Sequence, residues 1–115
     1  MIYFNYLLKA TEISNEFVQT NFLEQRDIRI LEIIFLNSFK PNNHLMVNDL
    51  IEITNLGSRA TIHRGLYRLR ESKVIDFFHK PGNYRFKYLM PAEKAVNYFS
   101  KLEQTMLTAA CPMGH

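Results

Sequence analysis

Residues 58–75 combine a helix start, an amphipathic period and a change to the period of a strand in one uninterrupted run. Ser58 is a favoured N-cap residue, because its hydroxyl can accept a hydrogen bond from a free backbone N–H of the first turn. Ile62, Leu66 and Leu69 recur at helical spacing and line one face. The run therefore predicts a helix with a narrow apolar face that leads directly into a β-strand.

The opposite side of this predicted helix is cationic and carries a hydroxyl group. The side chains that point away from the apolar stripe are Arg59, Thr61, His63, Arg64 and Arg68. A helix of this kind can lie in the major groove of DNA while it packs on its own domain. Arginines can form bidentate hydrogen bonds to guanine or hold phosphates, and a helix N-terminus attracts phosphate. Solvated surface side chains are the alternative interpretation, and for His63 an ordinary exposed histidine is as good an explanation as a pH-dependent DNA contact.

Positive charge is concentrated in one part of the chain. Residues 58–88 include eight basic and two acidic residues, whereas the remainder holds six basic and nine acidic residues, and the whole chain has a net charge of +3. Such asymmetry is typical of a surface that binds a polyanion. On composition alone, a charged face that is merely solvated is the alternative.

Length and composition are those of one globular domain. A chain of 115 residues with 47% hydrophobic residues can bury a core without disulfides or metal. Its single cysteine, Cys111, cannot form an intramolecular disulfide, and the absence of a cationic neighbour argues against a redox-sensing role. We recognise no secretory signal and no membrane-spanning run, so the expected location is the cytoplasm.

Four further segments have the helical period, at residues 2–22, 24–39, 47–53 and 92–106. The first is unusually apolar for a chain terminus and needs a partner, either the rest of the fold or a second subunit. In the second, apolar positions predict the buried face, and the charged residues Arg26, Asp27, Arg29 and Glu32 are expected outside. Gly57, just before Ser58, can take a positive φ without strain. Pro91 suits the first turn of the last helix.

Residues 74–90 alternate as strands do. Two strand-like segments flank residues 79–83, whose proline and glycine favour a chain reversal. The alternation directs Tyr84, Phe86 and Tyr88 to the core. The basic or polar residues Lys80, Asn83, Arg85 and Lys87 are candidates for contacts with phosphates or the minor groove. A charged hairpin that only protects an edge strand is the alternative.

The order of these elements, together with short segments within them, resembles the MarR-type transcriptional regulators. The segments similar to the DNA-binding part of that family are Leu45–Leu50, Gly57–Arg64 and Leu66–Ile75, and Leu89–Ala95 is similar to the passage from its wing to its last helix. The likeness spans about residues 24–105. The turn at residues 54–57 departs from the family pattern, since Gly57 directly precedes Ser58, and the chain is shorter than a typical member.

The resemblance implies a mainly α fold with a small β-hairpin wing, a winged helix-turn-helix whose terminal helices form a dimerisation lobe. Residues 1–108 would form a single domain, with dimerisation helices at 1–22 and 91–106, a DNA-binding core at 45–90, a wing at 76–88 and a flexible tail at 109–115. The function implied is sequence-specific binding of double-stranded DNA by a homodimeric repressor. The predicted contacts are Ser58, Arg59, Thr61, His63, Arg64, Tyr67 and Arg68 on the recognition helix, and Lys80, Asn83, Arg85 and Lys87 on the wing.

Other functions are compatible with the same fold. One is a protein–protein adaptor, and another is an RNA or single-strand binder in which Tyr67 stacks on a base. The sequence has no recognisable catalytic constellation, metal-ligand spacing or glycine-rich phosphate loop, so neither an enzyme nor a cofactor is expected. The resemblance also implies a small aromatic acid as an effector bound between the two lobes.

Overall fold

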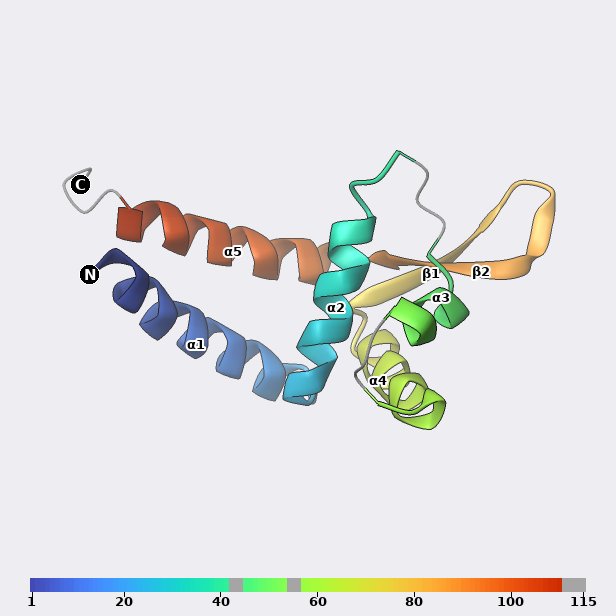
Figure 1. The fold of residues 1–115 in the computed structure, drawn as a ribbon, viewed down its shortest axis with the longest axis horizontal. Helices are drawn as coiled ribbons and strands as arrows, with labels where there is room; N and C mark the ends of the chain where they lie inside the picture. The colour runs from blue at the N-terminus through green and yellow to red at the C-terminus, as the bar shows by residue number, and fades with distance from the viewer. Residues whose placement is uncertain (42–44, 54–56, 111–115) are drawn as a thin grey trace.

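The computed structural model describes residues 1–41, 45–53 and 57–110. The elements are α1 (Ile2–Thr20), α2 (Gln25–Asn37), α3 (Val47–Ile53), α4 (Arg59–Glu71), β1 (Ile75–Lys80), β2 (Asn83–Pro91) and α5 (Glu93–Ala110). Figure 1 shows α1 and α5 side by side at one end of the molecule, the hairpin at the other, and α2, α3 and α4 between them. The predicted fold class, mainly helical with a small β-hairpin, is confirmed.

The hydrophobic core lies where α2, α4, the hairpin and the start of α5 meet. Ile62, Leu66 and Leu69 are buried, as their spacing predicts. They pack with apolar residues of the other elements, including Ile28, Leu31, Ile34, Leu50, Val74, Ile75, Leu89 and Ala95. Complete burial of one such side chain stabilises the fold by about 1.5–3 kcal/mol, so the cluster holds α4 firmly on the body.

Stacked aromatic rings attach α5 to both α1 and α2. The ring centroids of Phe17 and Tyr98 lie 4.2 Å apart, and those of Phe35 and Phe99 lie 4.1 Å apart. Burial raises the pKa of Tyr98, which keeps its phenol neutral. None of the described residues of α1 is buried, although Phe17 is half-buried. Most of α1 and the far end of α5 therefore project from the body, whereas Ala95 and Tyr98 at the start of α5 belong to the central core.

The hairpin is antiparallel, with Ile75 opposite Pro91 at its base. Gly82 has a φ of +80° in the predicted chain reversal. The backbone N–H of Leu89 donates to the carbonyl oxygen of Leu45 at 2.8 Å, which joins the hairpin to the segment before α3. This hydrogen bond fixes the base of the hairpin to the body.

Several predicted helix boundaries were wrong. Pro91 ends β2 instead of starting α5, because it continues the strand ladder opposite Ile75. The first helix ends at Thr20, since Phe22 turns away with a φ of +56°. The second helix spans 25–37 rather than 24–39, and α5 reaches Ala110, so residues 109 and 110 are helical instead of a tail.

Some predictions fall outside the described residues. These concern the turn residues 54–56, Cys111 and the remainder of the predicted tail, together with the side chains of Asn83 and Phe86. Within the described part of the chain, no helix is long and apolar enough to cross a membrane.

Tyr84 does not face the core, contrary to its alternating pattern. Its side chain is 73% exposed, whereas Tyr88 is buried as predicted. Figure 1 shows the reason, since the far end of the hairpin extends beyond the helical body. Alternation distinguishes the two faces of a strand, but it does not determine where the covering helices end.

Gly65 allows α4 to approach α2 closely. A Cβ atom at this position would lie 2.8 Å from Oδ1 of Asp27 and 2.8 Å from Cδ1 of Ile30. Both of these side chains are completely buried. The contact therefore leaves little room for any side chain at residue 65.

We expect Gly65→Ala to lower the free energy of unfolding by about 1–3 kcal/mol because of overpacking. In an open helix the same change would add about 1 kcal/mol of stability. Urea denaturation followed by circular dichroism measures the difference. His63→Ala, at an exposed position of α4, is the control and should change stability by less than about 0.5 kcal/mol. A Gly65→Ala protein as stable as the parent would contradict the close approach.

Candidate nucleic-acid interface

The N-terminus of α4 is capped as the sequence predicts. The backbone N–H of Thr61 donates to Oγ of Ser58 at 3.2 Å. Gly57, immediately before the cap, has a φ of +143°, a conformation that L side chains rarely adopt. The start of the helix is thus fixed by a side-chain cap that follows a glycine.

The polar face of α4 remains in solvent along most of its length. Thr61 is half-buried, and the exposed members are Ser58, Arg59, His63, Arg64 and Tyr67. Arg64 Nη2 donates to Oγ1 of Thr61 at 3.4 Å, and that oxygen lies 3.1 Å from Oγ of Ser58. Arg59 Nη1 donates to Oδ1 of Asn48 in α3 at 3.0 Å. The two arginines therefore have different anchors.

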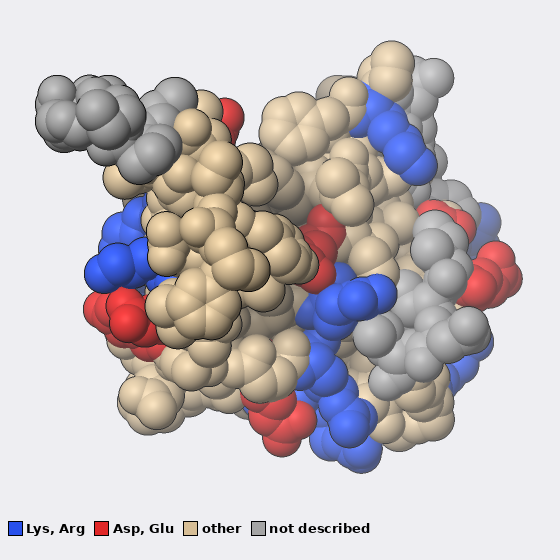
Figure 2. Space-filling view, turned by 60° about the vertical axis from the view of Figure 1, so that its left-hand side comes forward, with Lys and Arg blue, Asp and Glu red and all other residues tan. Residues whose placement is uncertain are grey.

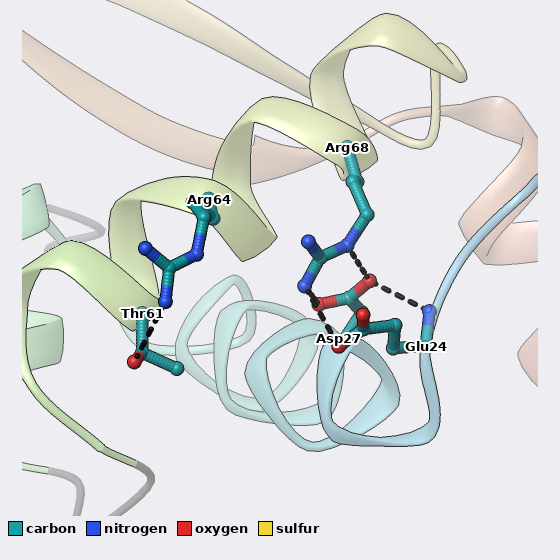
Figure 3. A network of polar contacts seen from close by, with 5 residues as sticks. All are labelled: Glu24, Asp27, Thr61, Arg64 and Arg68. Carbon is teal, nitrogen blue, oxygen red and sulfur yellow. Dashed lines mark hydrogen bonds and ion pairs between the residues drawn. The ribbon is translucent and has the colours of Figure 1, made fainter.

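Arg68 differs from the expected solvent-facing arginine. Its Nε donates to Oδ2 of Asp27 at 2.7 Å, and its Nη2 donates to Oδ1 of the same carboxylate at 2.9 Å. Nη2 also lies 3.3 Å from a carboxylate oxygen of Glu24. Figure 3 shows the guanidinium of Arg68 directed at the start of α2 and apart from the Thr61–Arg64 pair. The hydrogen bond to Asp27 raises the pKa of Arg68, so the group stays charged.

Asp27 was predicted to lie outside, and this was wrong. Its side chain is completely buried, and besides Arg68 it accepts a hydrogen bond from the backbone N–H of Glu24 at 2.8 Å. Burial of a carboxylate is tolerated only where such donors compensate for the lost water. The pair therefore fixes the recognition-helix candidate α4 to the first turn of α2.

A second set of polar contacts holds the C-terminal end of α4. Ser72 donates through its hydroxyl to the carbonyl oxygen of Asn21, which is itself buried. Lys94 of α5 donates to the carbonyl oxygen of Ser72 at 2.9 Å and to Oδ1 of Asn21 at 3.3 Å. The ends of α1 and α4 and the start of α5 thus meet at this cluster, which we call the Asn21 junction.

Tyr67 is exposed on the same helix, four residues before Glu71. Its hydrogen bond to Glu71 and the negative charge of that carboxylate raise the pKa of Tyr67, so the phenol stays protonated. The hydroxyl thereby has a local partner, while the ring remains open to solvent.

The predicted wing residues lie on the hairpin, partly held by aromatic rings. Lys87 Nζ lies 5.8 Å from the centroid of Phe77, and Arg70 of α4 lies 4.8 Å from the same ring. Lys80 Nζ lies 5.3 Å from the ring centroid of Tyr88. Cation–π contacts of this type limit the freedom of the cations without neutralising them. Arg85 is exposed.

The residues that position α4 were not among the predicted site residues. Asp27, Gly65 and Asn48 are examples, and each acts on a residue of another helix. One local signal was present, since a Glu-x-x-Asp pattern at the start of a helix is related to a capping box. No group of His, Cys, Asp or Glu in the described residues could hold a metal ion.

Solved structures with the same fold include MarR, S. aureus MepR and the transcriptional regulator PA4135. The chain superposes on MarR with a TM-score of 0.57 at 18% identity, covering 96% of this chain and 78% of MarR. A DNA complex of S. aureus MepR gives 0.66 at 12% identity, with 92% and 78% covered. The transcriptional regulator PA4135 gives 0.58 at 18% identity, with 93% and 77% covered.

Sequence comparison adds nothing to this result, because no protein-family model and no curated protein matches significantly. Structural similarity at these identities establishes the fold. The MarR-type winged-helix fold that the sequence segments predict is therefore confirmed.

Removing one partner of the Asp27–Arg68 pair should destabilise the protein. We expect Arg68→Met to lower the free energy of unfolding by about 3 kcal/mol, since it leaves a buried carboxylate without its main donors. Arg64→Met is the matched control on the same helix and should change stability by less than about 0.5 kcal/mol. Chemical denaturation of both variants measures this difference, and equal effects would show that the pair is not a structural anchor.

Proposed function

We propose that this chain is a sequence-specific double-stranded DNA-binding transcription regulator, which acts as a dimeric repressor. The observation that carries the proposal is the division of α4 into two faces. Its apolar face, Arg68 and Gly65 attach it to the body, while Ser58, Arg59, His63 and Arg64 stay exposed. A firmly mounted helix with an open cationic face is suited to insertion in a major groove.

The hairpin supports the same proposal. Its exposed Arg85 and Lys87 lie on the strand that follows the turn, and the far end of the hairpin extends beyond the body (Figure 1). In this arrangement the wing residues would contact phosphates or a neighbouring minor groove. The similarity to MepR, whose structure with DNA is known, makes duplex DNA the partner to test first.

A second copy of the chain is the partner we propose for the α1–α5 pair. Large apolar side chains are exposed on both helices, namely Ile2, Tyr3, Phe4, Leu7 and Leu8 on α1 and Val96, Met106 and Leu107 on α5. Figure 2, which brings this end of the molecule forward, shows a broad area without charged side chains. Exposed apolar patches of this kind mark association surfaces. The pair also places the start of α1 beside the end of α5, so a symmetric contact would combine four helices (Figure 1).

The small-molecule effector that the resemblance implies stays a prediction. A cleft of about 510 Å³ lies beside the Asn21 junction, and Phe22, Tyr67 and Lys73 are among its lining residues. A structure of MepR bound to ethidium bromide is among the similar ones. Ligand titrations of the protein–DNA complex are the appropriate test.

DNA binding should be specific and salt-dependent. We expect the protein to shift duplexes selected from a random pool, with much weaker binding at about 200 mM than at about 50 mM salt because phosphate contacts release counterions. Arg64→Ala should weaken binding to the selected duplex by about 1–3 kcal/mol if its guanidinium contacts a base. Gel-shift titration measures both effects.

Competitors in the same experiment separate the other functions. Preference for single-stranded DNA or RNA over the duplex would support base stacking on Tyr67 instead. A complete lack of nucleic-acid binding would favour a protein–protein adaptor and would contradict the proposed function.

Dimerisation should depend on the exposed apolar residues of α1. We expect the parent protein to have the mass of a dimer, and Leu7→Glu to shift it toward a monomer because a charge is costly in an apolar interface. Size-exclusion chromatography with light scattering measures the mass. Gln19→Glu, which adds the same charge at an exposed polar position of α1, is the control and should remain dimeric. A monomeric parent would refute the proposed second copy.

A further inference from the structure

We propose that Thr61 is a positioning residue that sets the guanidinium of Arg64 for bidentate contact with a guanine, so that these two side chains determine sequence preference. The inference rests on the proposed DNA-binding function and assigns different tasks to the arginines of α4. Three contacts among Ser58, Thr61 and Arg64 in the first turns of α4 support it.

The four arginines of α4 begin from different constraints, and Arg70 lies over the Phe77 ring of β1 at 4.8 Å from its centroid. Arg68 is held by the buried carboxylate of Asp27 and is only one-quarter exposed in its side chain. Arg59, the first residue of α4, donates a hydrogen bond of 3.0 Å to Asn48 of α3. Arg64 is exposed and bonded to a residue of its own helix, with no bond to the body among its described contacts. It is therefore the arginine best placed to exchange solvent for a base edge.

The position of the Thr61 hydroxyl is itself determined. Arginine has only donors, so Oγ1 of Thr61 is the acceptor of the 3.4 Å bond from Arg64 Nη2. Oγ1 also lies 3.1 Å from Oγ of Ser58, the capping atom that accepts from the Thr61 backbone. The helix cap thus continues as a short polar chain from Ser58 through Thr61 to Arg64, the last link of which is drawn in Figure 3.

The methyl group of Thr61 is confined as well. A Cβ atom at Gly57 would lie 3.0 Å from Cγ2 of Thr61, so the Thr61 side chain occupies the space beside this glycine. A β-branched side chain has few χ1 rotamers, which limits the directions that the hydroxyl can take. Thr61 therefore offers its hydroxyl to Arg64 from a nearly fixed direction.

A preset guanidinium has two consequences for recognition. Less rotamer freedom is lost on binding, which favours the complex in which the guanidinium already has the required orientation. Only one Nη group is engaged by Thr61, so other donors remain for the O6 and N7 acceptors of guanine, the most common specific contact of arginine. A direct Thr61–phosphate contact would instead strengthen binding to all sequences equally.

The test compares Thr61→Val, which keeps the shape and removes the acceptor, with Thr61→Ser, which keeps the acceptor. The probes are the duplex that the parent protein selects from a random pool, an unrelated duplex, and copies of the first with single guanines replaced by 7-deazaguanine, which lacks N7. We expect Thr61→Val to reduce the ratio of affinities for the selected and unrelated duplexes by about 5-fold or more, while binding to the unrelated duplex and its salt dependence stay unchanged. Thr61→Ser should retain the ratio within about 2-fold.

Two further measurements identify the coupling. One guanine replacement by 7-deazaguanine should weaken DNA binding by the parent protein, and the same replacement should not weaken binding by Thr61→Val. Adding Thr61→Val to Arg64→Ala should cause no further loss of affinity. Circular dichroism confirms that the variants are folded. An unchanged affinity ratio for Thr61→Val, or an equal loss on every duplex, overturns the positioning role while DNA binding stands. Failure of the parent to bind any duplex overturns both this role and the proposed function.

Discussion

Asp27 and Arg68 lie 41 residues apart in the sequence, and their paired hydrogen bonds join the first turn of α2 to the last turn of α4. The carboxylate has no contact with water, so the arginine and the backbone N–H of Glu24 must satisfy it. Gly65, one turn earlier, supplies the space in which the carboxylate fits. The ion pair, the close approach at Gly65 and the buried apolar residues of α4 thus all hold this helix against α2. Together they determine the direction in which the polar face of α4 points.

The Asp27–Arg68 pair separates the arginines of α4 into one that stabilises the fold and others that stay exposed. An arginine turned toward the body stabilises the fold, whereas those at the start of the helix remain available to a ligand. Counting basic residues in the sequence does not separate the two groups, since both contribute equally to net charge. The relevant quantity for polyanion binding is the charge left on the exposed face after internal ion pairs are formed.

Local patterns were sufficient to predict much of the fold. The stripe of Ile62, Leu66 and Leu69 and the cap at Ser58 depend on residues within one helix, so spacing and residue type determine them. Asp27 could not be placed in this way, because an isolated charged residue on an amphipathic helix is usually solvated and its partner is distant in sequence. Tyr84 failed for another reason, since strand alternation gives a face but not the extent of the body that covers it.

The Asn21 junction has a mechanical consequence for a molecule 52 Å long and only 23 Å thick. Lys94 and Ser72 connect the end of α4 to the point where α1 stops and α5 begins. The direction of α4 is therefore tied to that of the terminal helices by one cluster of polar contacts. In the proposed dimer, the angle between α4 and these helices would set the separation of the two copies of α4, and the spacing of DNA half-sites would report on it.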